Sequence, residues 1–107
     1  MEKRRLDNYV RGWFIGNFEP SVIKTNDVEV AVKEYSRGEY DPKHYHKKAT
    51  EITVVLHGLV KMNGEIYAKG DMIIIKPNDI SDLDALEDNT ITVVVKYPGI
   101  NNDKYVL

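Results

Sequence analysis

Residues 38–51 read GEYDPKHYHKKATE and hold two of the chain's three histidines together with a glutamate. His44 and His46 are two residues apart, so both rings leave the same face of a strand. Residues 47–50 are polar or small and suit a hairpin connection, which would place Glu51 across from His46 on the neighbouring strand. We therefore expect two imidazoles and one carboxylate to converge on one point, the arrangement that a divalent transition metal with open coordination positions needs.

The donor set narrows the choice of metal. Neutral imidazole nitrogens and a carboxylate oxygen suit manganese, iron, nickel or zinc. A His-x-His pair alone is weak evidence, because histidines are common at protein surfaces. The pair gains weight from a glutamate across a plausible hairpin, and from a strand-rich chain that can form a barrel around all three. The alternative is that the three side chains are solvated residues at one end of a sheet.

The composition is that of a soluble globular protein and limits the function classes. At 107 residues we expect one domain. The net charge of −2, with scattered basic residues, gives no sign of nucleic-acid binding. The chain has no cysteine, which excludes disulfides and thiolate metal sites. No apolar run has membrane-spanning length, and none follows the basic start as a signal peptide requires, so we expect a cytoplasmic protein.

Short alternating or β-branched segments, separated by turn residues, run through the chain. Asn63-Gly64 is the strongest short-range hairpin signal among them. Residues 80–86 alternate less clearly, and no segment is a convincing helix. The segments that we expect to be strands are 28–35, 51–56, 60–62, 65–67, 72–76 and 90–97. This pattern predicts an all-β sandwich or barrel.

The histidine segment resembles the first conserved motif of the cupin superfamily. The match consists of Gly38, five residues, His44, one residue, His46, four residues, Glu51, six residues and Gly58. Residues 70–82 resemble the second cupin motif. The resemblance implies a double-stranded β-helix, a jelly-roll barrel of two antiparallel sheets with metal and substrate inside one open end.

The same resemblance sets the expected domain organisation. It implies a single cupin domain over residues 1–107. Within this domain, residues 1–27 form an N-terminal arm and outer strands, residues 28–97 form the cupin core, and residues 98–107 form a C-terminal tail.

The second motif departs from the cupin pattern at the fourth ligand, where Asp82 stands in place of the usual histidine. A carboxylate can bind a divalent ion, so Asp82 is a predicted fourth metal ligand, with Asp84 as its substitute. Asp82 is alternatively a general base, a substrate contact or a surface aspartate near a turn. Tyr40 precedes the histidines and could line the mouth of the barrel or pack at its rim. Asp82 and Tyr40 are therefore the candidate catalytic residues for moving a proton.

Three functions fit the resemblance. Small single-domain cupins of this shape resemble those associated with sugar and polysaccharide metabolism, which implies a metal-dependent isomerase, epimerase or lyase acting on a sugar or sugar acid. The alternatives are an iron(II) dioxygenase, and a non-catalytic metal-dependent binding or sensing module. The expected partner is a small-molecule substrate, with no nucleic acid and no membrane. We also expect a homodimer through the Trp13-Phe14-Ile15 segment as an exposed edge strand, although an outer strand packed on the core is the simpler interpretation.

Overall fold

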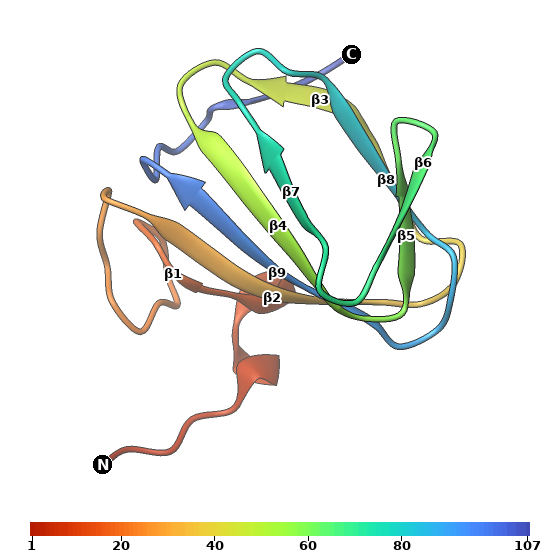
Figure 1. Ribbon diagram of the computed structural model, residues 1–107. Coiled ribbons are helices and arrows are strands. Elements are labelled where there is room, and N and C mark those ends of the chain that lie inside the picture. Colours follow the sequence, from red (N-terminus) through yellow and green to blue (C-terminus); the bar gives the residue numbers. More distant parts are fainter.

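The computed structural model describes residues 1–107 as two antiparallel sheets that face each other and roll into a barrel (Figure 1). The strand order of the first sheet is β1 (Trp13–Ile15), β2 (Glu29–Tyr35), β9 (Thr90–Tyr97), β4 (Thr50–His57) and β7 (Met72–Ile75). The strand order of the second sheet is β10 (Lys104–Val106), β3 (Tyr40–His46), β8 (Ser81–Ala85), β5 (Leu59–Met62) and β6 (Glu65–Ala68). The prediction of an all-β double-stranded β-helix is confirmed.

Helical structure is limited to two short 3₁₀ turns near the N-terminus, η1 (Leu6–Asn8) and η2 (Val10–Gly12). Neither has the length or the apolar character needed to cross a membrane. The C-terminal tail is part of the barrel, because β10 pairs with β3 along the outer edge of the second sheet.

One end of the barrel interior is apolar. Side chains alternate between the inside and the outside along each strand, so every second residue faces inward. The inward residues at this end form one buried cluster of Val55, Val60, Met62, Ile75 and Leu83. Full burial of a valine such as Val55 contributes about 1.5–3 kcal/mol relative to exposure, so this cluster is the main stabilising core.

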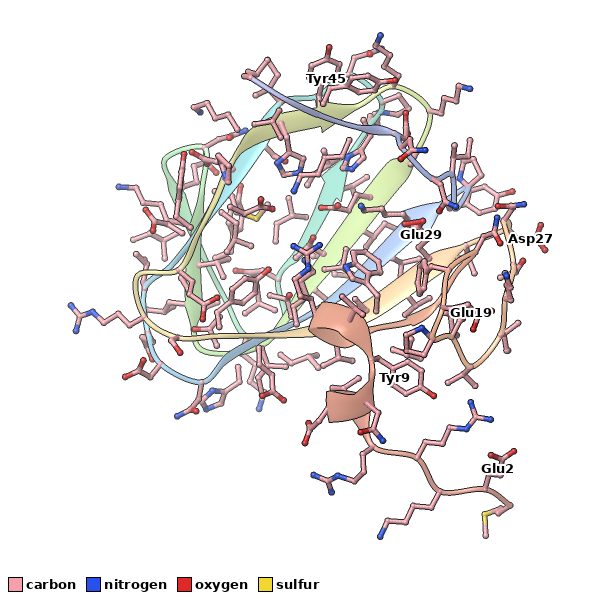
Figure 2. The ribbon with its side chains drawn as sticks, turned by 180° about the vertical axis from the view of Figure 1, so that it is seen from behind. Glu2, Tyr9, Glu19, Asp27, Glu29 and Tyr45 are labelled. Carbon is pink, nitrogen blue, oxygen red and sulfur yellow. The ribbon has the colours of Figure 1, made fainter.

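The inward positions at the other end are polar. The change occurs within single strands, because Val55 and Glu51 lie on the same face of β4. On β3 the alternation places the buried His44 and His46 inside and Tyr45 outside. The Tyr45 ring stacks on Tyr105 of β10, with 5.3 Å between the ring centroids, on the outer face of the barrel (Figure 2). The fold therefore gathers its buried histidines and carboxylates at one open end, whereas Thr90 and Thr92 are buried toward the apolar end.

The turn between β5 and β6 follows the predicted hairpin. Asn63 and Gly64 have φ angles of 49° and 84°, the left-handed conformation that a two-residue turn of this kind needs at both positions. The same turn contacts the start of β8. The Asn63 side chain donates a hydrogen bond to the carbonyl oxygen of Ile80, just before β8, at 2.7 Å and accepts one from the N–H of Asp82 at 3.2 Å. Residues 81–85, whose pattern in the sequence is less clear, are thereby held as a strand.

The edge strand β1 is covered by the chain itself. The backbone N–H of Val22 donates to the carbonyl oxygen of Phe14 at 2.8 Å, and Gly16 N–H donates to the carbonyl oxygen of Ile23 at 3.2 Å. Ile15 and Ile23 also form a parallel bridge. The backbone edge that we expected to pair with a second subunit is thus occupied within the chain, and the homodimer stays a prediction.

Candidate metal centre

Three candidate ligands meet at the polar end of the barrel. His44 and His46 come from β3 and Glu51 from β4, and one possible ligand atom of each lies within 4.8 Å of the others. The two imidazole rings are 5.4 Å apart between centroids and nearly perpendicular, at 89°. Two imidazoles and one carboxylate in this arrangement could hold a divalent ion that keeps open coordination positions.

The route by which these side chains meet differs from the predicted hairpin. β3 belongs to the second sheet and β4 to the first, so residues 47–49 carry the chain from one sheet to the other. The strand partner of His46 is Lys104, whereas Glu51 pairs with Lys96. The hairpin prediction is wrong, because Glu51 faces the histidines across the interior and does not stand beside them on a paired strand.

The His44 ring is oriented by its own strand. Its Nδ1 lies 2.8 Å from the carbonyl oxygen of Pro42, which can only accept, so Nδ1 carries the proton and donates. This leaves Nε2 as the nitrogen with a free lone pair, the form in which histidine binds a metal. Pro42 therefore supplies the outer contact of a candidate ligand.

His46 is buried and its Nε2 has no hydrogen-bond partner. Burial lowers the pKa of His46 to about 4, and the positive charges of Lys96 and His44 add to the effect, so the ring is neutral at pH 7. A buried nitrogen without a partner is unfavourable by about 1–3 kcal/mol. A metal ion would satisfy this lone pair, and the residues present therefore fit a bound divalent metal.

The connection between the ligands is held by Asp103, just before β10. Its carboxylate is buried and accepts backbone hydrogen bonds from Lys47 at 3.1 Å, Lys48 at 3.1 Å and Ala49 at 2.9 Å. Burial alone would raise the pKa of Asp103, but these three hydrogen bonds outweigh it and the pKa is lowered. The C-terminal tail thus positions the segment that joins His46 to Glu51.

Asp82 lies outside the group of candidate ligands. Its Oδ1 accepts the backbone N–H of Asn63 at 2.7 Å, and its Oδ2 accepts the Tyr40 hydroxyl at 3.2 Å and lies 3.6 Å from Lys43 Nζ. The neighbouring Ser81 is the residue that stands opposite His44 in the strand register. Asp82 is thus not among the three residues whose ligand atoms lie within 4.8 Å of one another, although it borders the same interior cavity, and its role as a fourth ligand stays a prediction.

The same contacts make the Asp82 carboxylate a weaker general base. The hydrogen bond from Asn63 lowers its pKa, although burial opposes the shift, and Tyr40 and Lys43 lower it further. A carboxyl group with a lowered pKa holds a proton less readily than an ordinary aspartate. Asp84 follows Asp82 on the same face of β8 and is likewise absent from the group of candidate ligands.

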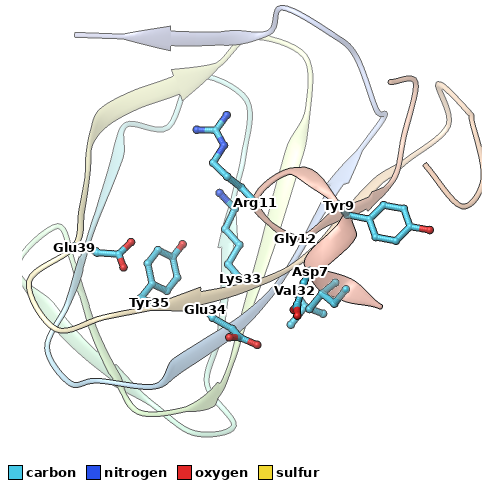
Figure 3. Close-up of a pocket in the computed structure, with 10 residues that line it drawn as sticks. Asp7, Tyr9, Arg11, Gly12, Val32, Lys33, Glu34, Tyr35 and Glu39 are labelled. Atoms are coloured by element: carbon cyan, nitrogen blue, oxygen red, sulfur yellow. The ribbon is translucent and has the colours of Figure 1, made fainter. Parts of the chain in front are cut away.

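Tyr40, the other predicted catalytic residue, is 53% exposed, and its hydroxyl donates a hydrogen bond to Asp82. It does not line the cavity beside the histidines. The tyrosine that does is Tyr35, which points from β2 into the barrel together with Lys33 (Figure 3). Burial raises the pKa of Tyr35 to about 12, with Asp41 adding to the shift, so its hydroxyl keeps its proton at neutral pH.

The residues that sequence reasoning missed come mostly from β2. Alternation along residues 29–35 puts Lys33 and Tyr35 on one face, but the sequence does not say that this face points toward His44. Trp13 was likewise interpreted as an outer residue, whereas it lines the same cavity. The sequence signal for this site is the alternation of residues 29–35, which puts Glu29, Lys33 and Tyr35 on the same face as the small Ala31.

Two adjoining cavities give access to this end. The interior one has a volume of about 40 Å³ and is lined by His44, Glu51 and Tyr35, among others. The outer one has a volume of about 460 Å³ and includes His46 in its wall. Both are bordered by Trp13, Lys96 and Lys104. The interior space holds little more than a water molecule, so the body of any ligand lies in the outer cavity.

Solved structures of other proteins share this architecture. A conserved protein with a double-stranded β-helix domain from Klebsiella pneumoniae aligns over 97% of this chain and 89% of its own, at 24% identity and a TM-score of 0.73. The DMSP lyase DddQ from Ruegeria pomeroyi aligns over 88% of this chain and 49% of its own, at 18% identity and a TM-score of 0.71. A sugar phosphate isomerase of the cupin superfamily from Silicibacter pomeroyi aligns over 66% of this chain and 50% of its own, at 18% identity and a TM-score of 0.61.

No protein-family model matches the chain, and no curated protein matches it. The structural likeness is nevertheless consistent across these proteins, and at such identities it establishes the fold. The chain has the cupin fold, a double-stranded β-helix, as the spacing from Gly38 to Gly58 indicated. It carries a candidate His-His-Glu metal centre inside the open end of that fold.

Proposed function

We propose that the chain binds a divalent transition metal through His44, His46 and Glu51, and acts as a metal-dependent isomerase, epimerase or lyase on a small polar substrate such as a sugar or sugar acid. The observation that carries this proposal is the neutral, unpartnered Nε2 of His46 beside two further ligand atoms. The fold that the chain shares with a DMSP lyase and a cupin sugar phosphate isomerase supports these reaction types.

The residues around the centre have separate roles in this function. A divalent ion bound there supplies Lewis-acid polarisation of a substrate carbonyl or hydroxyl group. His44 is held in the ligating tautomer by Pro42, and Tyr35 keeps its proton and can donate a hydrogen bond into the cavity. The outer cavity of about 460 Å³ falls within the usual range for small-molecule sites.

A second candidate is an iron(II) dioxygenase. With Asp82 outside the group, two histidines and one glutamate remain, and this donor set with open positions is typical of non-haem iron(II) oxygenases. The two candidates differ in their need for oxygen. Turnover of sugars or sugar acids without oxygen supports the isomerase, epimerase or lyase. Oxygen consumption with iron(II) supports the dioxygenase. Saturable binding without turnover supports a non-catalytic binding module.

Elemental analysis of the purified protein tests the metal centre itself. We expect one equivalent of a transition metal in the wild-type protein and in the Asp82→Ala variant, and loss of that metal in the His44→Ala/His46→Ala double variant. The Asp82→Ala variant is the matched control, because it removes a carboxylate near the cavity that makes no contact with the candidate ligands. Stoichiometric metal in the double variant would refute the site.

A further inference from the structure

The wall of the interior cavity carries two lysines that the proposed metal chemistry does not use. Lys33 comes from β2 and Lys96 from β9, and both lie against the indole of Trp13 from β1. Their Nζ atoms are 5.3 Å and 4.8 Å from the centroid of the Trp13 ring. Two ammonium groups and one aromatic ring therefore form a single cluster beside His44 and Glu51.

Neither lysine forms an ion pair, whereas other cations of this end do. Lys104 pairs with Asp41 at 3.1 Å and Lys43 lies 3.6 Å from Asp82. Lys96 stands between Glu29 and Glu51 in the strand register without reaching either within ion-pair distance. When Glu51 is committed to a metal, its charge is no longer available to Lys96, and Glu29 remains as the neighbouring carboxylate. Unpaired cations in a cavity are unfavourable until an anion enters.

A third cation approaches the same cluster from the N-terminal segment. Arg11 lines a cavity of about 310 Å³ together with Lys33 and Tyr35 (Figure 3). Burial lowers the pKa of Lys33, and the charges of Lys96, Lys104 and Arg11 act in the same direction while Asp41 opposes them. Lys96, Lys104 and Arg11 are thus the positive groups that act on Lys33, and the wall of the interior cavity also carries the carboxylates of Asp41, Glu51 and Asp82.

The geometry points to an anion subsite: we propose that Lys33 and Lys96 bind a carboxylate or phosphate group of the substrate while its hydroxyl or carbonyl oxygens face His44, His46 and Glu51. This proposal rests on the proposed function and narrows it to acidic substrates, sugar acids or sugar phosphates, over neutral sugars. Lysine is suited to both anions as a point charge. Trp13 and Lys96 border the outer cavity as well, so a ligand lying there reaches the subsite directly.

Trp13 is the only tryptophan of the chain, so its fluorescence reports on this cluster. We would titrate metal-free and manganese-loaded protein with two matched pairs of probes, gluconate against sorbitol and glucose 6-phosphate against glucose. The acidic member of a pair should bind at least about 10-fold more tightly than the neutral one, as expected for a hydrogen bond to a charged group. The acid that binds more tightly, gluconate or glucose 6-phosphate, identifies the preferred anion as carboxylate or phosphate.

Lys33→Met and Lys96→Met should each abolish most of this preference, and Lys69→Met, at an exposed turn far from the cavity, should leave it unchanged. Circular dichroism checks that the variants are folded. Because each lysine is replaced separately, the test can still be made if one of the two variants does not fold. Equal affinity for acid and neutral probes in the wild-type protein, or an unchanged preference in both folded cavity variants, would overturn the subsite.

Metal content measured on the same samples separates the two proposals. Metal-loaded protein that shows no preference for acids refutes the subsite and leaves the metal centre in place. Metal-free protein that still prefers gluconate or glucose 6-phosphate through Lys33 and Lys96 supports the subsite, even if His44, His46 and Glu51 prove unable to hold a metal.

Discussion

Replacing Asp103 by alanine should loosen the segment that sets the separation of His46 and Glu51. Its carboxylate accepts three backbone hydrogen bonds from residues 47–49. A hydrogen bond to a charged group contributes about 1.5–3 kcal/mol. Water can replace the carboxylate at the exposed Lys47 and Lys48, but the N–H of Ala49, a residue only 1% exposed, would lose its partner. We therefore expect Asp103→Ala to lower the free energy of unfolding by about 3 kcal/mol.

Denaturant unfolding of the metal-free protein at pH 7 measures this loss, and calorimetric titration with manganese or zinc measures the effect on the site. Affinity for the metal should fall about 10-fold, as is typical when a group that orients ligands is removed. Asp103→Asn should give intermediate values, because a neutral amide offers one accepting oxygen where the carboxylate offers two.

Asp71→Ala is the matched control for Asp103→Ala. The Asp71 carboxylate also accepts a backbone hydrogen bond, from Ala68 at 2.8 Å, but in an exposed turn between β6 and β7. It should lower the free energy of unfolding by less than about 1 kcal/mol and leave metal affinity unchanged. If Asp103→Ala unfolds at the wild-type denaturant midpoint and binds metal with wild-type affinity, the reasoning about this segment is refuted.

Three further predictions follow from the buried groups. The pKa of His46 is about 4 in the folded protein and about 6.5 in the unfolded chain, so on acidification the unfolded chain takes up a proton first. The free energy of unfolding should therefore fall by up to about 3 kcal/mol between pH 6.5 and pH 4. Denaturant unfolding of the metal-free protein should show this fall in the wild type and in His57→Gln, but not in a folded His46→Gln variant. Gly12→Ala should cost more stability than Gly38→Ala in thermal unfolding, since both have a positive φ but only a Cβ at Gly12 overlaps the carbonyl oxygen of Val32; equal losses would contradict this. Tyr35→Phe should lower turnover without changing metal content, because its hydroxyl faces the cavity but belongs to no candidate ligand; unchanged turnover would remove Tyr35 from the site.

The cupin fold could be predicted from this chain because its signals are local. Strands with period two, the Asn63-Gly64 turn and the spacing from Gly38 to Gly58 each depend on neighbouring residues alone, and each agrees with the structure. The three candidate ligands were expected to meet across a hairpin that does not exist, and the structure brings them together from two facing sheets instead.

The position of the Asp82 side chain could not be predicted, for a different physical reason. Moving one residue along a strand reverses the direction of its side chain. The resemblance places Asp82 at the position of a cupin ligand, but the sequence does not say on which face of the strand the Asp82 side chain falls. In the structure Ser81 pairs with His44, and the Asp82 carboxylate accepts hydrogen bonds from Asn63 and Tyr40.

By itself the sequence determined the two-sheet architecture, the absence of thiolate chemistry and the candidate ligands His44, His46 and Glu51, because these depend on residue type and short-range periodicity. Only the tertiary structure decided that Lys33, Tyr35 and Trp13 line the cavity and that Asp103 holds the segment between the ligands. Those contacts join residues far apart in the chain, and their positions depend on how the two sheets pack against each other across the barrel.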